Sequence, residues 1–412
     1  MSESARRDTL LIAAAKAVRG LGYGLLGVAL GLHLPTLGLS PSQVGVIFTA
    51  SLMGSALLTA LLVGLADRLG RRRSLIISAG LMVASGILFG LTDRFELLVM
   101  IGLLGTVSPT AGEVGPFETL EQAILPQTVA PRSRNRVFGW YNSLAAVMTS
   151  IGALLVAAPG WLGRSVGGGF GWTFFFYAAM GAAVLACYLF LSPAVELPPA
   201  VSPAEVPRRR LSASSRRTII GLSGLFGLDA LAGGFVLQSM IAYWFNLRFG
   251  VGAEVLGPLF AAVELLKAAS YLVAVWLADH IGLINTMVFS HLPSNLLLMA
   301  IPLMPTLPLA MTVLLLRHTL SQMDVPTRQS YVVAVVPPQD RTAASGITNL
   351  TRTITRMISP AIAGLALQSV GQGLPFFVGG GLKIVYDLAL FASFRGIKPA
   401  EETADSQDTP QN

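Results

Sequence analysis

Long apolar runs, separated by short polar segments, follow one another along the whole chain. A bilayer core requires about 20 consecutive apolar residues per helix, whereas the strands of membrane barrels alternate over about ten residues. The runs here are long, rich in leucine and do not alternate, so they predict membrane-spanning helices. We expect twelve spans, over 10–34, 43–66, 74–92, 97–125, 137–159, 171–192, 218–245, 255–278, 285–303, 308–336, 342–367 and 374–394.

The expected spans fall into two groups of six on either side of a proline-rich segment that carries Arg208, Arg209 and Arg210. Such a composition is typical of a linker, and the polar, acidic C-terminal end is typical of a disordered tail. The sequence therefore predicts an N-terminal six-helix bundle over 1–193, a cytoplasmic linker over 194–217, a C-terminal six-helix bundle over 218–398 and a disordered cytoplasmic tail over 399–412.

The two groups repeat each other at a separation of 212 residues. Self-similarity at a fixed separation indicates an internal structural repeat. We therefore expect two homologous halves in parallel orientation, related by an axis along the membrane normal. The pairs that match without a gap are Gly38 with Gly250, Gly45 with Gly257, Phe48 with Phe260, Leu65-Ala66-Asp67 with Leu277-Ala278-Asp279, and Gly70 with Gly282.

Composition supports a membrane protein and excludes other classes. Charged residues make up only 12% of the chain, against about 25% in soluble domains. Cys187 is the one cysteine, so neither a disulfide within the chain nor a multi-cysteine metal site can form. The net charge of +7 comes from short loops and not from one soluble module, so we expect no nucleic-acid partner.

The positions of the basic residues also predict the orientation. Lysine and arginine accumulate in cytoplasmic loops. Runs such as Arg71 to Arg73 and Arg208 to Arg210 lie on one side of the predicted topology, whereas the loops on the other side hold only Arg94, Arg164 and Arg248. We therefore predict a multi-pass protein of the cell membrane with both termini in the cytoplasm.

The loop between the second and third spans reads LADRLGRRRSL over 65–75. It resembles the signature loop of the major facilitator superfamily, G-x-L-A-D-R-x-G-R-K/R-x-x-L, and residues 277–282 resemble a degenerate second copy. The resemblance implies an all-α membrane protein with twelve transmembrane helices in two pseudo-symmetric six-helix bundles, without cofactor or metal. The chain departs from the family pattern at Val63, where the family has glycine, and it lacks the helix 5 signature G-P-x-x-G-G of drug antiporters.

The resemblance also implies a gating role for this loop and its copy. Asp67 would brace against the N-terminus of the helix that begins near Thr342, where the helix dipole favours a carboxylate. The alternative is a solvated Asp67 that pairs locally with Arg71. The tight turn itself requires glycine, and its arginines hold the loop inside by charge. The candidate gating residues are Asp67, Arg68, Gly70, Arg71, Asp279 and Gly282.

Many charged residues lie within the expected spans, where each costs about 2.5–3.5 kcal/mol at the bilayer centre. We therefore expect them to face a water-filled cavity or one another. The resemblance implies that helices 1, 4, 7 and 10 line such a cavity, and most of these charges lie on those helices or on helices 8 and 11. The residues are Lys16, Arg19, Glu113, Glu118, Glu121, Asp229, Glu264, Lys267, Arg317, Asp324, Arg328, Arg352, Arg356, Lys383 and Asp387.

The tenth span carries a polar stripe on an otherwise apolar helix. Arg317, Ser321, Asp324 and Arg328 follow one another in steps of four, three and four, which places them within about 60° of one face. Pro326 lies within the stripe and can break the local hydrogen-bond ladder. The stripe indicates either a solute or proton site at mid-membrane or a static salt bridge between helices.

Two sets of site residues follow from these positions. Arg19 and Asp229 lie at the same depth in the two halves, and we expect them to pair, whereas Lys383 and Asp387 can neutralise each other at i, i+4. Clustered arginines suit a carboxylate or phosphate, unless Glu113, Glu118 and Glu121 neutralise them. The proton-coupling candidates are Glu113, Glu118, Asp324, Asp229 and Glu264, and the substrate-binding candidates are Arg19, Tyr23, Arg317, Arg328, Arg352, Arg356 and Gln238.

These patterns predict a secondary active transporter that moves a small organic solute, with an anion as one interpretation, by alternating access and with protons as the coupling ion. The alternatives within transport are a passive facilitator and a drug efflux carrier. The alternative from another functional class is a non-transporting membrane receptor or scaffold. An enzyme is not expected, because the chain contains no G-x-x-x-x-G-K-[S/T], H-E-x-x-H or G-x-S-x-G motif. We expect a monomer.

Overall fold

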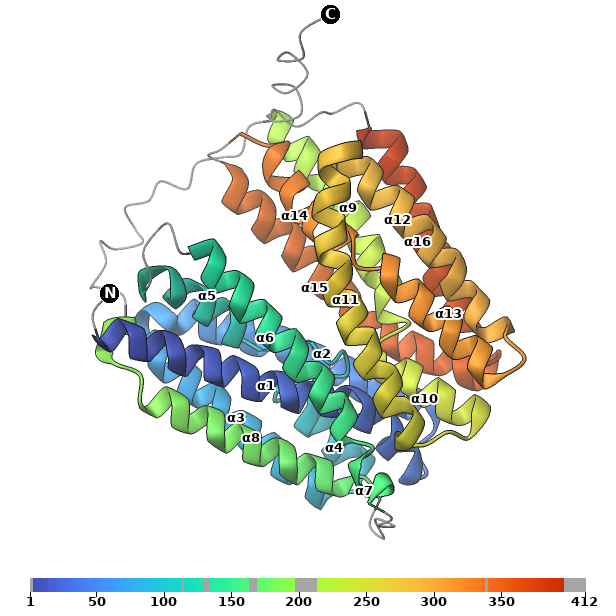
Figure 1. Cartoon of the computed structure of the whole chain (residues 1–412), viewed down its shortest axis with the longest axis horizontal. Helices are drawn as coiled ribbons and strands as arrows, with labels where there is room; N and C mark the ends of the chain where they lie inside the picture. Colours follow the sequence, from blue (N-terminus) through green and yellow to red (C-terminus); the bar gives the residue numbers. More distant parts are fainter. Residues whose placement is uncertain are drawn as a thin grey trace, which may run out of the picture. The chain divides into compact units, whose positions relative to one another are not determined.

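A computed structural model describes residues 3–112, 115–128, 134–162, 169–196, 213–337 and 340–395 (Figure 1). These residues form helices, turns and bends, and no strand occurs among them. The chain divides into two compact units, each described here by itself. Two long helices, α11 (Ala253–Ile281) and α15 (Arg341–Ser369), contribute residues to both units.

The first unit contains the N-terminal helices together with residues 237–265 and 360–370. Its helices are α1 (Glu3–Thr36), α2 (Pro41–Leu69), α3 (Arg71–Leu91), α4 (Phe95–Gly102), α5 (Phe117–Thr128), α6 (Arg134–Leu155), α7 (Ala158–Trp161), α8 (Gly171–Leu189), the short η2 (Pro193–Val195) and α10 (Gln238–Phe249). The buried helix α1 packs against α6, α8 and α10, and α3 packs along α8 (Figure 1).

The second unit contains α9 (Ala213–Gly234), α12 (Leu283–Ala300), the short η4 (Ile301–Leu303), α13 (Leu307–Leu320), α14 (Asp324–Ala334) and α16 (Leu374–Phe394). Helix α12 packs against α13, α14 and α16, and α9 packs against α16 (Figure 1). A buried apolar cluster that includes Phe226, Met287, Tyr331 and Leu390 joins α9, α12, α14 and α16.

Eight helical stretches of the described chain are long and apolar enough to cross a membrane. They correspond to the predicted spans over 10–34, 43–66, 74–92, 171–192, 218–245, 255–278, 285–303 and 374–394. Of the other four predicted spans, 137–159 corresponds to α6 and 342–367 to α15, both single helices. The remaining two, 97–125 and 308–336, are interrupted.

The fourth predicted span is broken where the sequence predicted one helix. Helix α4 ends at Gly102 and α5 begins at Phe117, and the described residues between them are turns and bends. Irregular backbone at membrane depth is tolerated only where protein or a water-filled cavity satisfies its polar groups. Here the Ser239 amide donates to the Pro109 carbonyl over 3.0 Å, and the Gly115 amide donates to Ser55 Oγ over 2.8 Å.

The tenth predicted span is also broken, between Leu320 at the end of α13 and Asp324 at the start of α14. Pro326 explains the position of the break, because it has no amide hydrogen to donate to the carbonyl four residues earlier, at Gln322. The apolar stretch Ser215–Phe249, which corresponds to the seventh predicted span, contains a short non-helical segment at 235–237 between α9 and α10.

The repeated loop has the same backbone structure in both copies. Gly70 joins α2 to α3 with φ +88° and ψ 148°, and Gly282 joins α11 to α12 with φ +82° and ψ 164°. Each glycine amide donates over 2.9 Å to the carbonyl four residues earlier, at Ala66 and Ala278. Positive φ favours glycine in both turns. Two copies of one motif, 212 residues apart, predict this agreement.

The compact units do not coincide with the predicted bundles, because residues 237–265 and 360–370 group with the N-terminal helices. Contacts define the units, whereas the internal repeat defines the predicted bundles. The division into bundles over 1–193 and 218–398 therefore stays a prediction. Most of the predicted linker over 194–217 and all of the predicted tail over 399–412 lie outside the described residues.

Close packing of α1 on α6 yields a testable prediction. A methyl group at Gly24 would lie 1.9 Å from the Thr149 carbonyl oxygen, so Gly24→Ala forces the two helices apart. We expect a loss of about 3 kcal/mol or more in the free energy of unfolding, measured as a lower Tm of the purified protein. The control is Gly80→Ala in α3, where no atom lies within 4 Å of the added methyl group and the Tm should not fall. Equal Tm values for the two variants would contradict this packing.

Candidate functional site

A cavity of about 220 Å³ lies within the second unit, among α9, α12, α13, α14, α15 and α16. Its lining is mostly polar and charged. Five of the lining side chains are cationic, whereas only two are carboxylates and one is a histidine. The residues are Arg317, Arg328, Arg352, Arg356 and Lys383, then Asp229 and Asp324, and then His291; Ser321 and Gln322 also line it.

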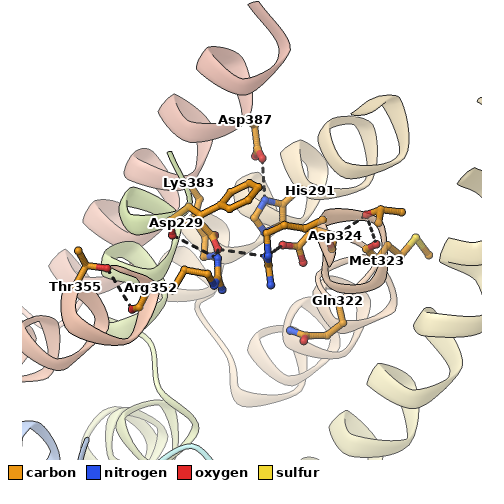
Figure 2. A network of polar contacts seen from close by, with 12 residues as sticks. Asp229, His291, Gln322, Met323, Asp324, Arg352, Thr355, Lys383 and Asp387 are labelled. Carbon is orange, nitrogen blue, oxygen red and sulfur yellow. Dashed lines mark hydrogen bonds and ion pairs between the residues drawn. The ribbon is translucent and has the colours of Figure 1, made fainter. Parts of the chain in front are cut away.

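Asp229 is the centre of the charged network in this cavity (Figure 2). Lys383 Nζ lies 2.5 Å from its Oδ1, and Arg352 Nη1 lies 2.8 Å from its Oδ2. A third cation, Arg328 Nη1, lies 3.7 Å from the same Oδ2. One buried carboxylate from α9 therefore joins cations from α14, α15 and α16.

Helix α14 supplies an acid and a base at i, i+4. Arg328 Nη1 donates to Asp324 Oδ2, and both side chains are buried. The break before Asp324 places this carboxylate in the first turn of α14, where the positive end of the helix dipole stabilises it. Arg328 therefore interacts with two carboxylates, Asp324 on its own helix and Asp229 on α9.

Three polar groups of the lining have no hydrogen-bond acceptor or donor among the described residues. Arg317 and Ser321 are buried, yet Arg317 Nε and Ser321 Oγ have no partner. Arg356 lines the same cavity and makes no side-chain hydrogen bond within the described chain. A buried polar group without a partner costs about 1–3 kcal/mol, so Arg317 Nε and Ser321 Oγ are suited to bind a solute, whereas Arg356 is exposed.

His291 and Asp387 extend the network into α12 and α16. His291 Nδ1 lies 2.8 Å from Asp387 Oδ1 (Figure 2). Asn295 Nδ2 donates over 2.8 Å to Asp387 Oδ2. All three side chains are buried, and His291 also lines the cavity. Neither His291 nor Asn295 is among the site residues predicted from the sequence. The signal that could have indicated them is their spacing of four residues on an otherwise apolar helix.

The first unit holds a separate buried ion pair. Arg19 donates from Nη1 and Nη2 to the two carboxylate oxygens of Glu121, over 3.0 and 2.6 Å. The hydroxyl groups of Tyr141 and Tyr188 donate to the same carboxylate over 2.6 and 2.7 Å. Because Arg19 and Glu121 are fully buried, the four side chains form one closed network between α1, α5, α6 and α8.

The sequence profile of the Major Facilitator Superfamily matches residues 12–319 and 249–411, which together cover nearly the whole chain. The chain belongs to the major facilitator superfamily. It is therefore a multi-pass membrane transporter of small molecules and not an enzyme.

Two curated proteins are similar to the chain in sequence. The chain is 26% identical over 426 residues to the Uncharacterized membrane protein YJR124C of Saccharomyces cerevisiae, with 95% of both chains covered. It is 26% identical over 178 residues to the Multidrug export protein EmrB of Haemophilus influenzae, which covers 43% of this chain and 33% of that protein.

Solved structures of superfamily members share the fold at low sequence identity. The nucleoside transporter NupG matches with a TM-score of 0.74 and 15% identity, over 94% of this chain and 100% of that chain. A bacterial homolog of the human lysosomal transporter Spinster matches with a TM-score of 0.72 and 16% identity, over 96% and 98%. The human organic anion transporter MFSD10 matches with a TM-score of 0.62 and 18% identity, over 94% and 100%.

The signature loop of the superfamily is anchored by a residue that the sequence analysis did not identify. The carboxylate of Glu196 accepts from the backbone amides of Arg71 and Arg72, over 2.6 and 3.1 Å, at the N-terminus of α3. The Arg71 side chain donates to the Ala123 carbonyl, and Arg72 donates to the Leu189 carbonyl over 2.6 Å. Of the candidate gating residues, Arg68 and Asp279 are exposed, and the side chain of Asp67 lies outside the described residues.

Two expected ion pairs have other partners in the structure. Their depth in the two halves predicts a pair of Arg19 with Asp229, but Arg19 binds Glu121, and Asp229 binds Lys383 and Arg352. Helical spacing predicts a pair of Lys383 with Asp387, but Asp387 binds His291 and Asn295. Spacing along a helix shows which side chains of that helix can contact each other. The packing of neighbouring helices determines which ion pairs between helices form.

The remaining candidates are scattered. Glu118 lies 3.7 Å from Lys16 and is 40% exposed, Tyr23 packs on Tyr177 with ring centroids 6.0 Å apart, and Glu264 is buried in α11. Gln238 is buried at the start of α10, and its Nε2 has no hydrogen-bond partner within the described chain. Glu113 lies outside the described residues. Of the twelve substrate and proton candidates, the cavity gathers Asp229, Arg317, Asp324, Arg328, Arg352 and Arg356.

Proposed function

We propose that this protein is a proton-coupled carrier of small organic anions that works by alternating access in the cell membrane. The excess of cationic side chains in the cavity of the second unit carries the proposal. Guanidinium and ammonium groups bind carboxylate and phosphate groups strongly in apolar surroundings. With five cations and two carboxylates in its lining, the cavity has an excess of positive charge that an anionic solute would balance.

The partners of Asp229 support proton coupling. In the structure the Asp229 carboxylate forms ion pairs with Lys383 and Arg352. A proton on Asp229 would neutralise the carboxylate and release both cations toward an anion in the cavity. Proton binding and anion binding therefore favour each other, and such coupling is reciprocal. This sign predicts symport, in which the anion and the proton cross the membrane in the same direction.

The names of similar proteins do not select a solute, because they refer to nucleosides, organic anions and multidrug export. Drug export is the second candidate function, since the likeness to EmrB extends over 178 residues. The distribution of arginines among the loops supports the proposed orientation, with both termini in the cytoplasm. We propose that the carrier acts as a monomer.

Transport in proteoliposomes tests the proposal. The purified protein is reconstituted in vesicles of phosphatidylethanolamine and phosphatidylglycerol, with an interior more alkaline than the exterior. Radiolabelled mono- and dicarboxylates and organic phosphates are compared with nucleosides, sugars and cationic dyes. We expect one class of anion to accumulate. A difference of one pH unit is equivalent to about 1.4 kcal/mol per proton, so one-to-one symport accumulates the anion up to about tenfold.

The controls separate the alternatives. Protein-free vesicles should show no accumulation, and a protonophore should abolish it. An anion that only equilibrates would indicate a passive facilitator and would contradict proton coupling. Preferential movement of cationic dyes would indicate drug export and would contradict the anion proposal. No flux of any solute would favour a receptor or scaffold.

A further inference from the structure

The break between α13 and α14 places an unusual guanidinium group in the cavity wall. Arg317, in the last turn of α13, is 6% exposed and lines the cavity. Within the described chain no carboxylate lies within salt-bridge distance of it, and its one side-chain contact is the 3.1 Å hydrogen bond from Nη1 to His318 Nε2. Its Nε has no acceptor among the residues that the structure describes.

The contacts of His318 determine which of its ring nitrogens carries hydrogen. His318 Nδ1 lies 2.8 Å from the Leu314 carbonyl oxygen, which can only accept, so Nδ1 carries the hydrogen. His318 Nε2 is then free to accept from Arg317 Nη1, because guanidinium nitrogens only donate. The histidine is therefore neutral and holds one side of the guanidinium in a fixed orientation.

The other edge of the Arg317 guanidinium contains Nε, which is buried and has no acceptor within the described chain, and Arg317 lines the cavity. A guanidinium presents Nε and one terminal nitrogen as two parallel donors, and this edge matches the two oxygens of a carboxylate. Ser321 lies one turn further along, and its buried Oγ also has no hydrogen-bond partner in the described part of the chain. Two unsatisfied donor groups, four residues apart and both nine-tenths buried, thus line the same cavity.

We propose that Arg317 and Ser321 form a carboxylate subsite, in which the Nε edge of Arg317 binds both oxygens of the solute carboxylate and Ser321 Oγ donates to one of them. His318 is a positioning residue that acts through Arg317. The inference rests on the proposed function and narrows the solute class from anions in general to carboxylates. A planar group fits this single edge, whereas a tetrahedral phosphate requires donors from more directions than one edge and one hydroxyl provide.

Ligand-dependent thermal stability tests the subsite. The purified full-length protein is heated with monocarboxylates of two to six carbons, with the matching amides and with the matching phosphonates, and the apparent Kd follows from the shift in Tm. We expect a carboxylate to bind at least tenfold more tightly than its amide. Arg317→Lys, which keeps the charge and loses the two-donor edge, should weaken the carboxylate by about tenfold or more. Ser321→Ala should weaken it about threefold to tenfold, and the exposed Arg248→Lys should not change it.

The possible outcomes lead to different conclusions. If no anion stabilises the wild-type protein, the proposed function itself is wrong. If carboxylates stabilise the wild type and Arg317→Lys equally, the subsite is wrong and the proposed function stands. If phosphonates bind as tightly as carboxylates, the restriction to carboxylates is overturned. The Tm without ligand identifies a misfolded variant, and in that case Ser321→Ala decides the question, since its loss removes no hydrogen bond of the described chain.

A test of His318 must distinguish positioning of Arg317 from a role in packing alone. His318→Leu should reduce the preference for a carboxylate over its matching amide, because Arg317 loses its fixed orientation. His318→Gln, whose side-chain oxygen can accept from Arg317, should restore the preference at least in part. Equal preferences in these two variants would remove the positioning role from His318 and leave the Arg317–Ser321 subsite in place.

Discussion

An Asp229→Asn variant is expected to lose gradient-driven accumulation of the anion while it still exchanges labelled for unlabelled anion across the membrane. Asparagine resembles the protonated carboxylate and cannot ionise. Lys383 and Arg352 then lose their ion pairs with the Asp229 carboxylate, whose oxygens lie 2.5 and 2.8 Å from Lys383 Nζ and Arg352 Nη1 in the structure. The cavity stays available to the anion, but residue 229 no longer takes up a proton when the anion binds, so coupling is lost.

The same substitution should lower stability, because breaking a buried ion pair on one side costs about 3–5 kcal/mol. Both effects are measured on one preparation, as Tm in detergent and as accumulation and exchange in vesicles, with the anion that the transport panel identifies. The matched control is Glu96→Gln, which makes the same chemical change at an exposed position of α4. Accumulation at the wild-type level by Asp229→Asn would falsify the coupling role.

The buried pair in the first unit should give the largest loss of stability outside the cavity. Arg19→Met leaves the fully buried Glu121 without its cation, and Glu121→Leu leaves Arg19 and two tyrosine hydroxyl groups without their acceptor. Each single substitution should cost about 3–5 kcal/mol in the free energy of unfolding. The double variant should be more stable than either single variant, because it leaves no uncompensated charge.

A double-mutant cycle measures this coupling. The control cycle uses Lys16 and Glu118. Their charged atoms are 3.7 Å apart, and the side chain of Glu118 is 40% exposed. The coupling energy of this partly exposed pair should be only about 0–1 kcal/mol. The cycle at Arg19 and Glu121 should exceed the control by about 2 kcal/mol or more. Additive effects of the two substitutions would show that the pair contributes no specific interaction energy.

Much of the fold was accessible from local patterns. The apolar runs identified every membrane span that the structure describes as one long apolar helix, since a run of this length has no other stable arrangement in a bilayer. The loop over 65–75 identified the superfamily, which the profile match shows. Apolar length did not reveal that the spans over 97–125 and 308–336 are interrupted, although Pro116 and Pro326 marked places where a helix ladder can break.

The polar stripe of the tenth span was also visible in advance, because steps of four, three and four residues place side chains on one face of a helix. The structure places Arg317, Ser321, Asp324 and Arg328 around one cavity. Even here the break at 321–323 changes the local geometry, and it brings Asp324 to the first turn of a new helix.

The pairing of charges could not be predicted in this way. Lys383 and Asp387 share one face of α16, yet each binds a residue from a different helix, Asp229 of α9 and His291 of α12. Spacing reveals contacts within a helix, whereas contacts between helices depend on how those helices pack. The roles of His291 and Asn295 could not be predicted, because a single histidine or asparagine on an apolar helix does not by itself indicate a polar network.

The sequence by itself determined that the chain spans a membrane, that it repeats one motif after 212 residues, and which helices carry charge, because these properties follow from apolar length, glycine turns and helical periodicity. Only the tertiary structure decided which carboxylate holds which cation and which donors remain without a partner. Those facts depend on distances between helices that are far apart in the chain, and a few ångströms there separate an ion pair from an open binding group.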